Sequence, residues 1–331
     1  MSNFEHRHHA HCESGVMSSM LRHHGLNISE PMIFGLSNAL NFAYIPFVKM
    51  GGMPLVAYRS MPKSIIKNIK NNLKIDMKLE TFSSQEKGEK RLDELLLEGK
   101  VVGAQSSVYW LEYFPKEISF HFNAHNLLIY DKEDDEYLIS DPVFDKSVRC
   151  SKKSLSKARF TKGVMAPKGL LYYPLNIPSQ IDLKPIIAKN IKQLSKNMLR
   201  RFVPIAGLKG IEYLSKSILK LKSREKKYQK LFLGNIVRMQ EEIGTGGAGF
   251  RFMYASFLKE ASELFNNDKI LQDASALMLE VGDEWREFAL TIAKAIKSKK
   301  AIDLEMISDK LMKISKNEAK VYKKLLEFKR Y

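Results

Sequence analysis

The chain has 331 residues, of which 44% are hydrophobic, 10% aromatic and 27% charged, so it is long and apolar enough to bury a core in one or two domains. Only two cysteines occur, which excludes a disulfide framework and favours a reducing compartment. The formal net charge of +17 predicts an acidic partner or an anionic surface. We find no secretory signal and no apolar run near the ~20 residues of a membrane span, so we expect a cytoplasmic protein.

The first predicted element is a short amphipathic helix that directly follows Cys12. Apolar residues between Val16 and Leu21 recur at helical spacing, and Gly25 is a typical C-terminal stop. The start of a helix carries partial positive charge, so a thiol there is favoured as the thiolate, which is the reactive form of cysteine. The alternative is a buried structural cysteine, which the polar residues around Cys12 disfavour.

Helices and strands then alternate as far as residue 173, and beyond residue 183 the pattern is helical and rich in lysine. In chain order we predict helices over 32–42, 60–73 and 84–98, and strands over 54–59, 78–82, 101–108, 125–130, 137–141 and 163–173. The sequence therefore predicts an α+β domain over residues 1–178, followed by a mostly α-helical domain over residues 179–331.

A histidine and an aspartate follow Cys12 in an informative order. His125 begins one predicted strand and Asp141 ends the next, so a hairpin between them brings the two side chains within hydrogen-bonding reach. This is the chain order of papain-like cysteine enzymes, in which the histidine pairs with the thiol and the carboxylate orients the histidine. Structural alternatives are a core histidine at His125 and, at Asp141, the start of a turn before Pro142.

A run of histidines, His6, His8, His9 and His11, precedes Cys12. Four imidazoles and a thiol suit zinc or copper, but their spacing matches no closed structural site, and we expect no metal. Papain-like enzymes often carry a side-chain amide six residues before the nucleophile, where it serves the oxyanion hole. His6 occupies that position and is a candidate donor to the oxyanion; His11 is a further oxyanion or pocket candidate.

Several motifs, together with these residues, make the chain resemble the butirosin biosynthesis protein H family. Those in the first 174 residues are HCES at 11–14, LNISE at 26–30, FGLSNAL at 34–40, YWLEY at 109–113 and HFNAH at 121–125. The C-terminal half resembles the helical domain that is often fused to it, through EIGTGGAGFR at 242–251 and YASFLKEA at 254–261. The resemblance thus extends over both predicted domains.

The resemblance implies a papain-like domain that is used for acyl transfer rather than for proteolysis. The namesake of the family takes an aminoacyl group from an acyl carrier protein thioester and places it on an amine of an aminoglycoside. By position, Cys12 would be the nucleophile, His125 the general base and acid, and Asp141 the orienting carboxylate. His121 would line the same pocket. No cofactor is implied, because the substrate thioester is itself carried on phosphopantetheine.

We therefore predict an acyltransferase of specialised metabolism that moves an acyl or aminoacyl group from a carrier protein or coenzyme A thioester to an amine or hydroxyl. The basic chain fits an acidic acyl carrier protein as partner, and contact with a membrane surface is a further option. We find no nucleic-acid-binding motif. Two alternatives stay open, a cysteine peptidase or amidase of related fold and a non-enzymatic basic docking protein.

A glycine-rich segment at 244–249 precedes a predicted helix over 250–265. It is neither a Walker loop nor a dinucleotide fingerprint, because no Gly-Lys-Ser/Thr follows it and no strand leads into it. The backbone amides of Gly246 and Gly247, with Arg251 just after them, are candidates to bind phosphate or pantetheine. The alternative is a tight turn between helices.

Overall fold

The computed structural model describes residues 3–116, 122–200, 202–243 and 245–329. Its contacts divide the chain into two compact units, both discontinuous in sequence. The first, here called the α+β unit, comprises Met1–Ile33 and Ile65–Ile181. The second, the helical unit, comprises Phe34–Ser64 and Asp182–Tyr331. The units therefore do not follow one division between residues 178 and 179, because an early segment of the chain packs with the late helices.

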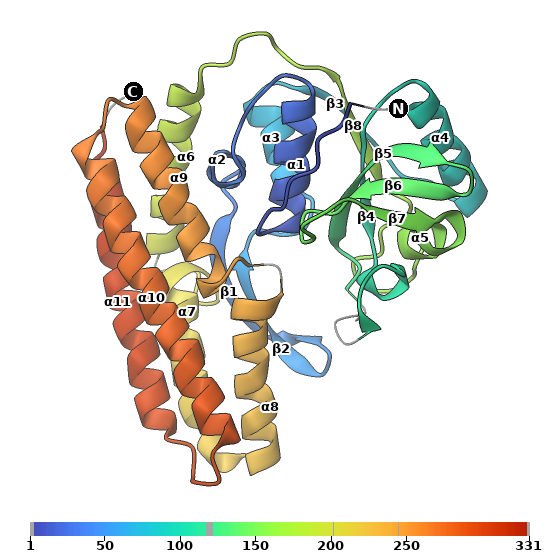
Figure 1. Ribbon diagram of the computed structural model, residues 1–331. Coiled ribbons are helices and arrows are strands. Elements are labelled where there is room, and N and C mark those ends of the chain that lie inside the picture. Colours follow the sequence, from blue (N-terminus) through green and yellow to red (C-terminus); the bar gives the residue numbers. More distant parts are fainter. Residues whose placement is uncertain (1–2, 117–121, 201, 244, 330–331) are drawn as a thin grey trace. The chain divides into compact units, whose positions relative to one another are not determined.

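The α+β unit is built on a six-stranded antiparallel sheet with the strand order β3-β8-β4-β5-β6-β7 (Figure 1). The strands are β3 (Asp76–Glu80), β4 (Val102–Ser106), β5 (His125–Glu133), β6 (Glu136–Ser140), β7 (Val148–Ser151) and β8 (Leu171–Asn176). The helices are α1 (Cys12–His23), α3 (Ser64–Asn72), α4 (Gln85–Leu97), the 3-10 turn η1 (Val108–Trp110) and α5 (Lys152–Arg159). A short helix, α2 (Glu30–Leu36), spans the division between the two units.

Strands β4 and β5 lie at the centre of this sheet and are the most deeply buried. All of β4 and the first five residues of β5 are buried, because α1 packs against them on one side and α4 and α5 on the other (Figure 1). Such strands need apolar or hydrogen-bonded residues on both faces. A histidine at the start of β5 is therefore placed in a largely dry environment, where its hydrogen-bond partners decide its charge.

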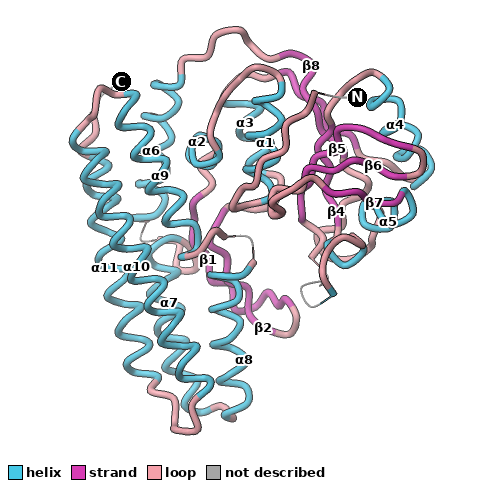
Figure 2. The backbone as a smooth tube through the Cα atoms, in the orientation of Figure 1, coloured by secondary structure: helices cyan, strands magenta, loops and turns pink. Residues whose placement is uncertain are grey.

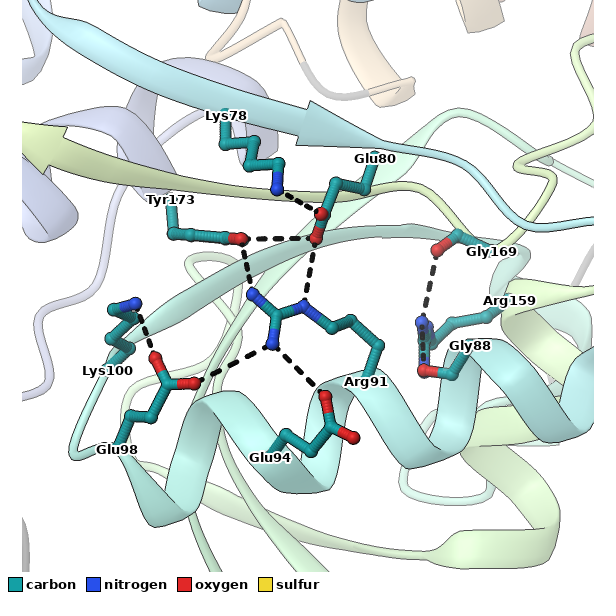
Figure 3. A network of polar contacts seen from close by, with 10 residues as sticks. All are labelled: Lys78, Glu80, Gly88, Arg91, Glu94, Glu98, Lys100, Arg159, Gly169 and Tyr173. Carbon is teal, nitrogen blue, oxygen red and sulfur yellow. Dashed lines mark hydrogen bonds and ion pairs between the residues drawn. The ribbon is translucent and has the colours of Figure 1, made fainter.

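Polar contacts fix α4 to the edge of the sheet formed by β3 and β8 (Figure 3). Arg91 of α4 donates to Glu80 of β3 at 3.4 Å and to the hydroxyl of Tyr173 of β8 at 3.0 Å. Arg159 of α5 donates to the carbonyl of Gly88 in α4 at 3.2 Å. These long-range contacts tie both helices to the same framework, and we assign them a structural role.

In the helical unit, a β-hairpin packs among the helices (Figure 2). Its strands are β1 (Leu40–Met50) and β2 (Met53–Arg59). The helices are α6 (Leu183–Leu199), α7 (Gly207–Leu219), α8 (Lys226–Val237), α9 (Arg251–Leu264), α10 (Lys269–Lys297) and α11 (Leu304–Leu326), with short turns η3 (Lys220–Ser223), η4 (Arg238–Glu242) and η5 (Ala248–Phe250).

Aromatic side chains explain why the hairpin belongs to the helical unit. Phe42 of β1 and Tyr58 of β2 both pack on Trp285 of α10, with ring centroids 5.9 Å and 5.5 Å away. Tyr44 packs on Phe232 of α8 at 6.4 Å. Large aromatic groups bury much apolar surface, so these contacts hold the segment against helices more than 170 residues away in the chain.

Two predicted elements were wrong in part. The helix predicted over 32–42 ends at Leu36, because Asn38 adopts a left-handed φ of 55° and β1 begins at Leu40. The strand predicted over 163–173 begins only at Leu171. Strands β1 and β7 and helix α5 were not predicted. β7 and α5 are short and polar and carry little periodic signal, whereas the start of β1 overlaps the helix predicted over 32–42.

Candidate active site

Cys12 is the first residue of α1, and only 5% of it is exposed. The helix begins there because His11 caps it. The backbone N–H of Ser14 donates to His11 Nδ1 at 3.3 Å, and His11 itself has an extended backbone with φ of −141°. His11 Nδ1 is thus an acceptor within the cap and not a donor to an oxyanion. The arrangement places the Cys12 thiol at the positive end of α1.

Glu30 holds the turn that leads into Cys12. Its buried carboxylate accepts hydrogen bonds from the backbone N–H groups of Ala10 and His11 and from the Ser14 hydroxyl, each at 2.9 Å. The sequence does not predict this role for Glu30. The available signal was its occurrence in the LNISE motif, but no local pattern indicates that its side chain turns back toward residues 10–14.

His125 and Asp141 form a buried ion pair, in which His125 Nε2 donates to Asp141 Oδ2 at 2.7 Å. Burial alone would lower the pKa of His125, but the Asp141 carboxylate and a side-chain hydrogen bond with Cys12 raise it to about 10. Because Nε2 is occupied by Asp141, Nδ1 is the ring nitrogen that remains for the thiol. The structure thus brings together Cys12, His125 and Asp141.

The register of the strand pairs explains why His125 and Asp141 lie close together. His125, the first residue of β5, pairs with Ser106 of β4, whereas Leu128 of β5 pairs with Ser140 of β6. Asp141 follows Ser140 directly, so its side chain reaches back along β5 to His125. The turn between β5 and β6 is at residues 134–135, and a shift of one residue would send the side chain of Asp141 to the other face.

Tyr113 is a site residue that the sequence predictions missed. Its hydroxyl donates to Asp141 Oδ2 at 2.8 Å, on the same oxygen that binds His125. Burial and then the charge of Asp141 raise the pKa of Tyr113 well above its ordinary value, so the phenol stays protonated and remains a donor. In the sequence, Tyr113 appears only as a member of the YWLEY motif, and the motif does not indicate that its hydroxyl binds Asp141. The N–H of Val143 donates to the other oxygen of Asp141 at 3.3 Å.

Three of the four histidines before Cys12, His6, His9 and His11, make hydrogen bonds to other parts of the protein. His6 Nε2 donates to the carbonyl of Phe144 at 3.0 Å, and Nδ1 is 2.7 Å from the Ser140 hydroxyl. Both ring nitrogens are therefore occupied, which does not support the oxyanion role predicted for His6. His9 contacts the Ser19 hydroxyl at 3.0 Å. Within the described ranges no group of three His, Cys, Asp or Glu is arranged to hold a metal ion. His121 lies outside the described residues.

Residues 245–249 of the glycine-rich segment form a closed turn within the helical unit. The N–H of Gly247 donates to the Thr245 hydroxyl at 3.0 Å, and the N–H of Ala248 donates to the Glu241 carboxylate at 3.1 Å. The protein's own carboxylate thus occupies a position where a phosphate would be expected. Gly246 is exposed but brings no side chain, and Gly247 is buried.

Arg251 is fully buried and pairs with Glu318 of α11 at 2.8 Å. Its other terminal nitrogen donates to the carbonyl of Gly249 at 2.8 Å. A guanidinium that is committed to a buried carboxylate is not available to a phosphate from solvent. The predicted phosphate or pantetheine site at Gly246, Gly247 and Arg251 is therefore not supported, and the segment is a tight turn between helices.

A cysteine that begins a helix, with a histidine and an aspartate beside it on an antiparallel sheet, is the arrangement expected of a papain-like domain. Residues 11–142 match the family model described as Butirosin biosynthesis protein H, N-terminal. Residues 153–325, more than half of the chain, match the domain of unknown function DUF4872, and the chain belongs to that family. It therefore combines a butirosin biosynthesis protein H N-terminal domain with a DUF4872 domain.

A crystal structure described as that of a candidate C39-like peptidase from Bacillus anthracis is also similar to this chain. The identity is 14% and the TM-score 0.38, over 55% of this chain and 98% of that one. No curated protein matches the chain. The predicted fold class, an α+β papain-like domain followed by a helical region over α6–α11, is confirmed. In the part of the chain that the structure describes, no helix is long and apolar enough to cross a membrane.

Proposed function

We propose that the protein is an acyltransferase in which Cys12 accepts an acyl group from a thioester and passes it to an amine or hydroxyl. The observation that carries the proposal is the buried contact of His125 with both Asp141 and Cys12 at the start of α1. A thioester donor suits a cysteine, because exchange of an acyl group between two sulfurs is nearly thermoneutral. The match to the butirosin biosynthesis protein H N-terminal model supports the same chemistry.

In the first step, His125 carries a proton on both ring nitrogens, in keeping with its raised pKa, and the Cys12 sulfur attacks the carbonyl carbon of the donor thioester as the thiolate. The bond between that carbon and the donor sulfur breaks, and the leaving thiolate takes the proton from His125. The product is an acyl group on Cys12. Asp141 holds the imidazole in place and stabilises its protonated form throughout.

In the second step, the acceptor amine or hydroxyl attacks the carbonyl carbon of the acylated Cys12. His125 takes a proton from the acceptor and returns it to the cysteine sulfur as the carbon–sulfur bond breaks. Cys12 is one of the groups that raise the pKa of His125, so acylation, which removes the thiolate charge, lowers that pKa. His125 is then better able to act as a base.

The donor we propose is the phosphopantetheine thioester of an acidic acyl carrier protein, or coenzyme A. The net charge of +17 supports an acidic partner, because opposite charges accelerate encounter. The acceptor would be a small amine or hydroxyl compound. If water replaces it, the same residues release the free acid, and the protein is a hydrolase of related fold.

Intact-mass spectrometry tests the proposal. The protein is mixed with an acyl-loaded carrier protein or acyl coenzyme A, and we expect the mass of the acyl group to be added to the wild type but not to Cys12→Ala. Cys150→Ala is the matched control, because Cys150 is buried in the α+β unit and burial raises its pKa to about 12. It should acylate like the wild type.

The second stage adds a panel of amines. Transfer of the acyl group to an amine supports the acyltransferase, whereas free acid alone assigns the site to hydrolysis. Turnover without any adduct, or an adduct that persists in Cys12→Ala, would exclude Cys12 as the nucleophile. Neither adduct nor turnover in the wild type, together with wild-type behaviour of Cys12→Ala in cells, would favour a non-enzymatic docking protein.

A further inference from the structure

The positive charge of the protein is concentrated in the helical unit. That unit carries 34 Lys and Arg against 18 Asp and Glu, a net charge of +16, whereas the α+β unit carries 20 against 19, a net charge of +1. Cys12, His125 and Asp141 all belong to the nearly neutral unit. The surplus charge therefore lies in the unit that does not contain these three residues, and what it binds can be tested separately from acyl transfer.

Part of this surplus gathers at one end of the helical unit, in residues 216–227 and 294–300. These two segments hold ten Lys and Arg, all exposed, against one acidic residue, Glu225. The two segments lie side by side, as the hydrogen bond from the Lys226 side chain to the carbonyl of Lys299 at 3.1 Å shows. We call them the basic end. In Figure 1 it is the lower end of the helices, where α7 is followed by α8 and α10 by α11.

The hairpin of β1 and β2 presents exposed apolar side chains near the basic end. Ile45 pairs with Leu55 and Lys49 with Pro54, so residues 46–48 bulge out of the strand ladder. Within this bulge Phe47 is 74% exposed and Val48 is 40% exposed. Phe47 and Val48 together form a small exposed apolar patch, and such a patch beside polar or charged groups is suited to a contact surface.

Contacts with α8 place the bulge relative to the basic end. The Asn235 side chain donates to the carbonyl of Pro54 at 3.3 Å, so the tip of the hairpin lies beside Asn235. Lys227 precedes Asn235 by eight residues on the same helix, a distance of about 12 Å along its axis. Figure 1 shows the hairpin beside α8, and the opposite end of that helix belongs to the basic end. The apolar Phe47–Val48 bulge and the cationic side chains of the basic end thus belong to one region of the helical unit.

We propose that the basic end and the Phe47–Val48 bulge form one surface of the protein, and that this surface binds peripherally to membranes that contain anionic phospholipids. Lys and Arg are attracted to anionic headgroups within a Debye length, about 8 Å at physiological salt. A convex apolar tip enters a fluid interface without a complementary pocket, whereas a folded protein partner would have to provide one. Stable peripheral binding requires two signals, and this face combines charge with an apolar side chain.

Vesicle co-sedimentation of the full-length protein tests this inference. We expect binding to phosphatidylcholine vesicles that contain about one third phosphatidylglycerol, weak binding to pure phosphatidylcholine, and release at high salt. Charge reversal in the basic end, Lys220→Glu with Lys227→Glu, should lower the partition coefficient at least about tenfold. Phe47→Ser with Val48→Ser should lower it severalfold while the salt dependence persists.

Two matched controls keep the test specific. Lys87→Glu with Lys90→Glu makes the same charge change on exposed lysines of α4, and Leu97→Ser removes an apolar side chain that is 89% exposed. Both controls should bind vesicles like the wild type. The inference fails if the protein does not bind, binds both vesicles equally, or loses binding equally in the controls.

An acidic carrier protein that binds the basic end, without any vesicle binding, would assign this face to the carrier and overturn the membrane inference. Acyl transfer in solution is measured in parallel on the Phe47→Ser, Val48→Ser variant. Retained acyl transfer with lost vesicle binding separates this inference from the proposed function, since neither residue belongs to the Cys12 site.

Discussion

At the scale of single residues, the charge state of His125 depends on contacts made by its neighbours. Asp141 Oδ2 accepts from both His125 and Tyr113, and its other oxygen accepts from the N–H of Val143. A carboxylate held by several donors in a buried site keeps its position and charge. In the proposed mechanism, Tyr113 would therefore act through Asp141, as a positioning residue.

Tyr113→Phe removes one hydrogen bond to Asp141 and should destabilise the fold by about 1.5–3 kcal/mol, the range for a hydrogen bond to a charged group. Asp141 then concentrates its charge on His125, so the pKa of the imidazole should rise further. We expect kcat to fall and the pH profile of kcat/KM to move to higher pH. Tyr109→Phe, in the same motif, is the control and should leave the profile unchanged. An unshifted profile for Tyr113→Phe would show that Tyr113 acts on stability alone.

The raised pKa of His125 also leads to a prediction of how the free energy of unfolding depends on pH. Its folded pKa of about 10 lies above the ordinary value of 6.5, so its contribution is fully present below about pH 6.5 and is lost as the pH rises toward about 10. Urea unfolding of wild type and His125→Gln should therefore differ more at about pH 6 than at about pH 10. A difference that grows as the pH rises would contradict a protonated, Asp141-paired imidazole.

At the scale of elements, the start of α1 depends on a carboxylate from another helix. Glu30, the first residue of α2, accepts hydrogen bonds from Ala10, His11 and Ser14, so two elements together set the backbone immediately before Cys12.

The glycine of the FGLSNAL motif, Gly35, is also explained by a contact between two elements. A Cβ on Gly35 would lie 2.1 Å from a ring carbon of Phe257, so the close approach of α2 to α9 requires glycine there.

Glu30→Gln retains the size of the side chain but replaces one acceptor oxygen by a donor. One of three hydrogen bonds at the turn should be lost, which costs about 1–3 kcal/mol of stability and displaces Cys12. We expect kcat for acyl transfer to fall about tenfold or more while KM changes little, because a small misplacement of reacting groups is costly. Glu5→Gln, an exposed carboxylate, is the control. Equal losses in both variants would argue against a positioning role.

At the scale of the whole molecule, the helical unit is held together around a buried ion pair. Glu318 of α11 accepts from Arg251 at 2.8 Å, from Trp285 Nε1 at 3.0 Å and from the Tyr322 hydroxyl at 2.6 Å. The Arg251 guanidinium also lies over the rings of Tyr58 and Trp285. One buried charge pair thus joins α9, α10 and α11 to the hairpin.

Glu318→Gln leaves the buried Arg251 without its counter-charge, which should destabilise the protein by about 3–5 kcal/mol. Replacement of both partners, as Arg251→Met with Glu318→Leu, should cost clearly less, because no charge remains buried. Glu287→Gln, in an exposed pair with Lys310, should change stability by about 1 kcal/mol or less. Denaturant unfolding measures all three. A double variant as unstable as Glu318→Gln would contradict this explanation.

Local sequence determined a large part of the fold and of the site. Hydrophobic periodicity located α1, α3, α4 and the β5–β6 hairpin to within a few residues, because each signal depends on neighbours along the chain. The order of Cys12, His125 and Asp141 indicated their meeting, since a hairpin has few registers that leave apolar residues inside. Their catalytic roles remain a prediction that the acylation experiment tests.

Only the tertiary structure decided which distant side chains meet. Glu30 and Tyr113 reach the site through contacts that no local pattern encodes, and the ring nitrogens of His6 are taken by Ser140 and Phe144. The burial of Arg251 and the packing of Phe34–Ser64 with the helices are of the same kind. Periodicity reports which face of an element is apolar, but the partner of that face is chosen by packing over the whole chain.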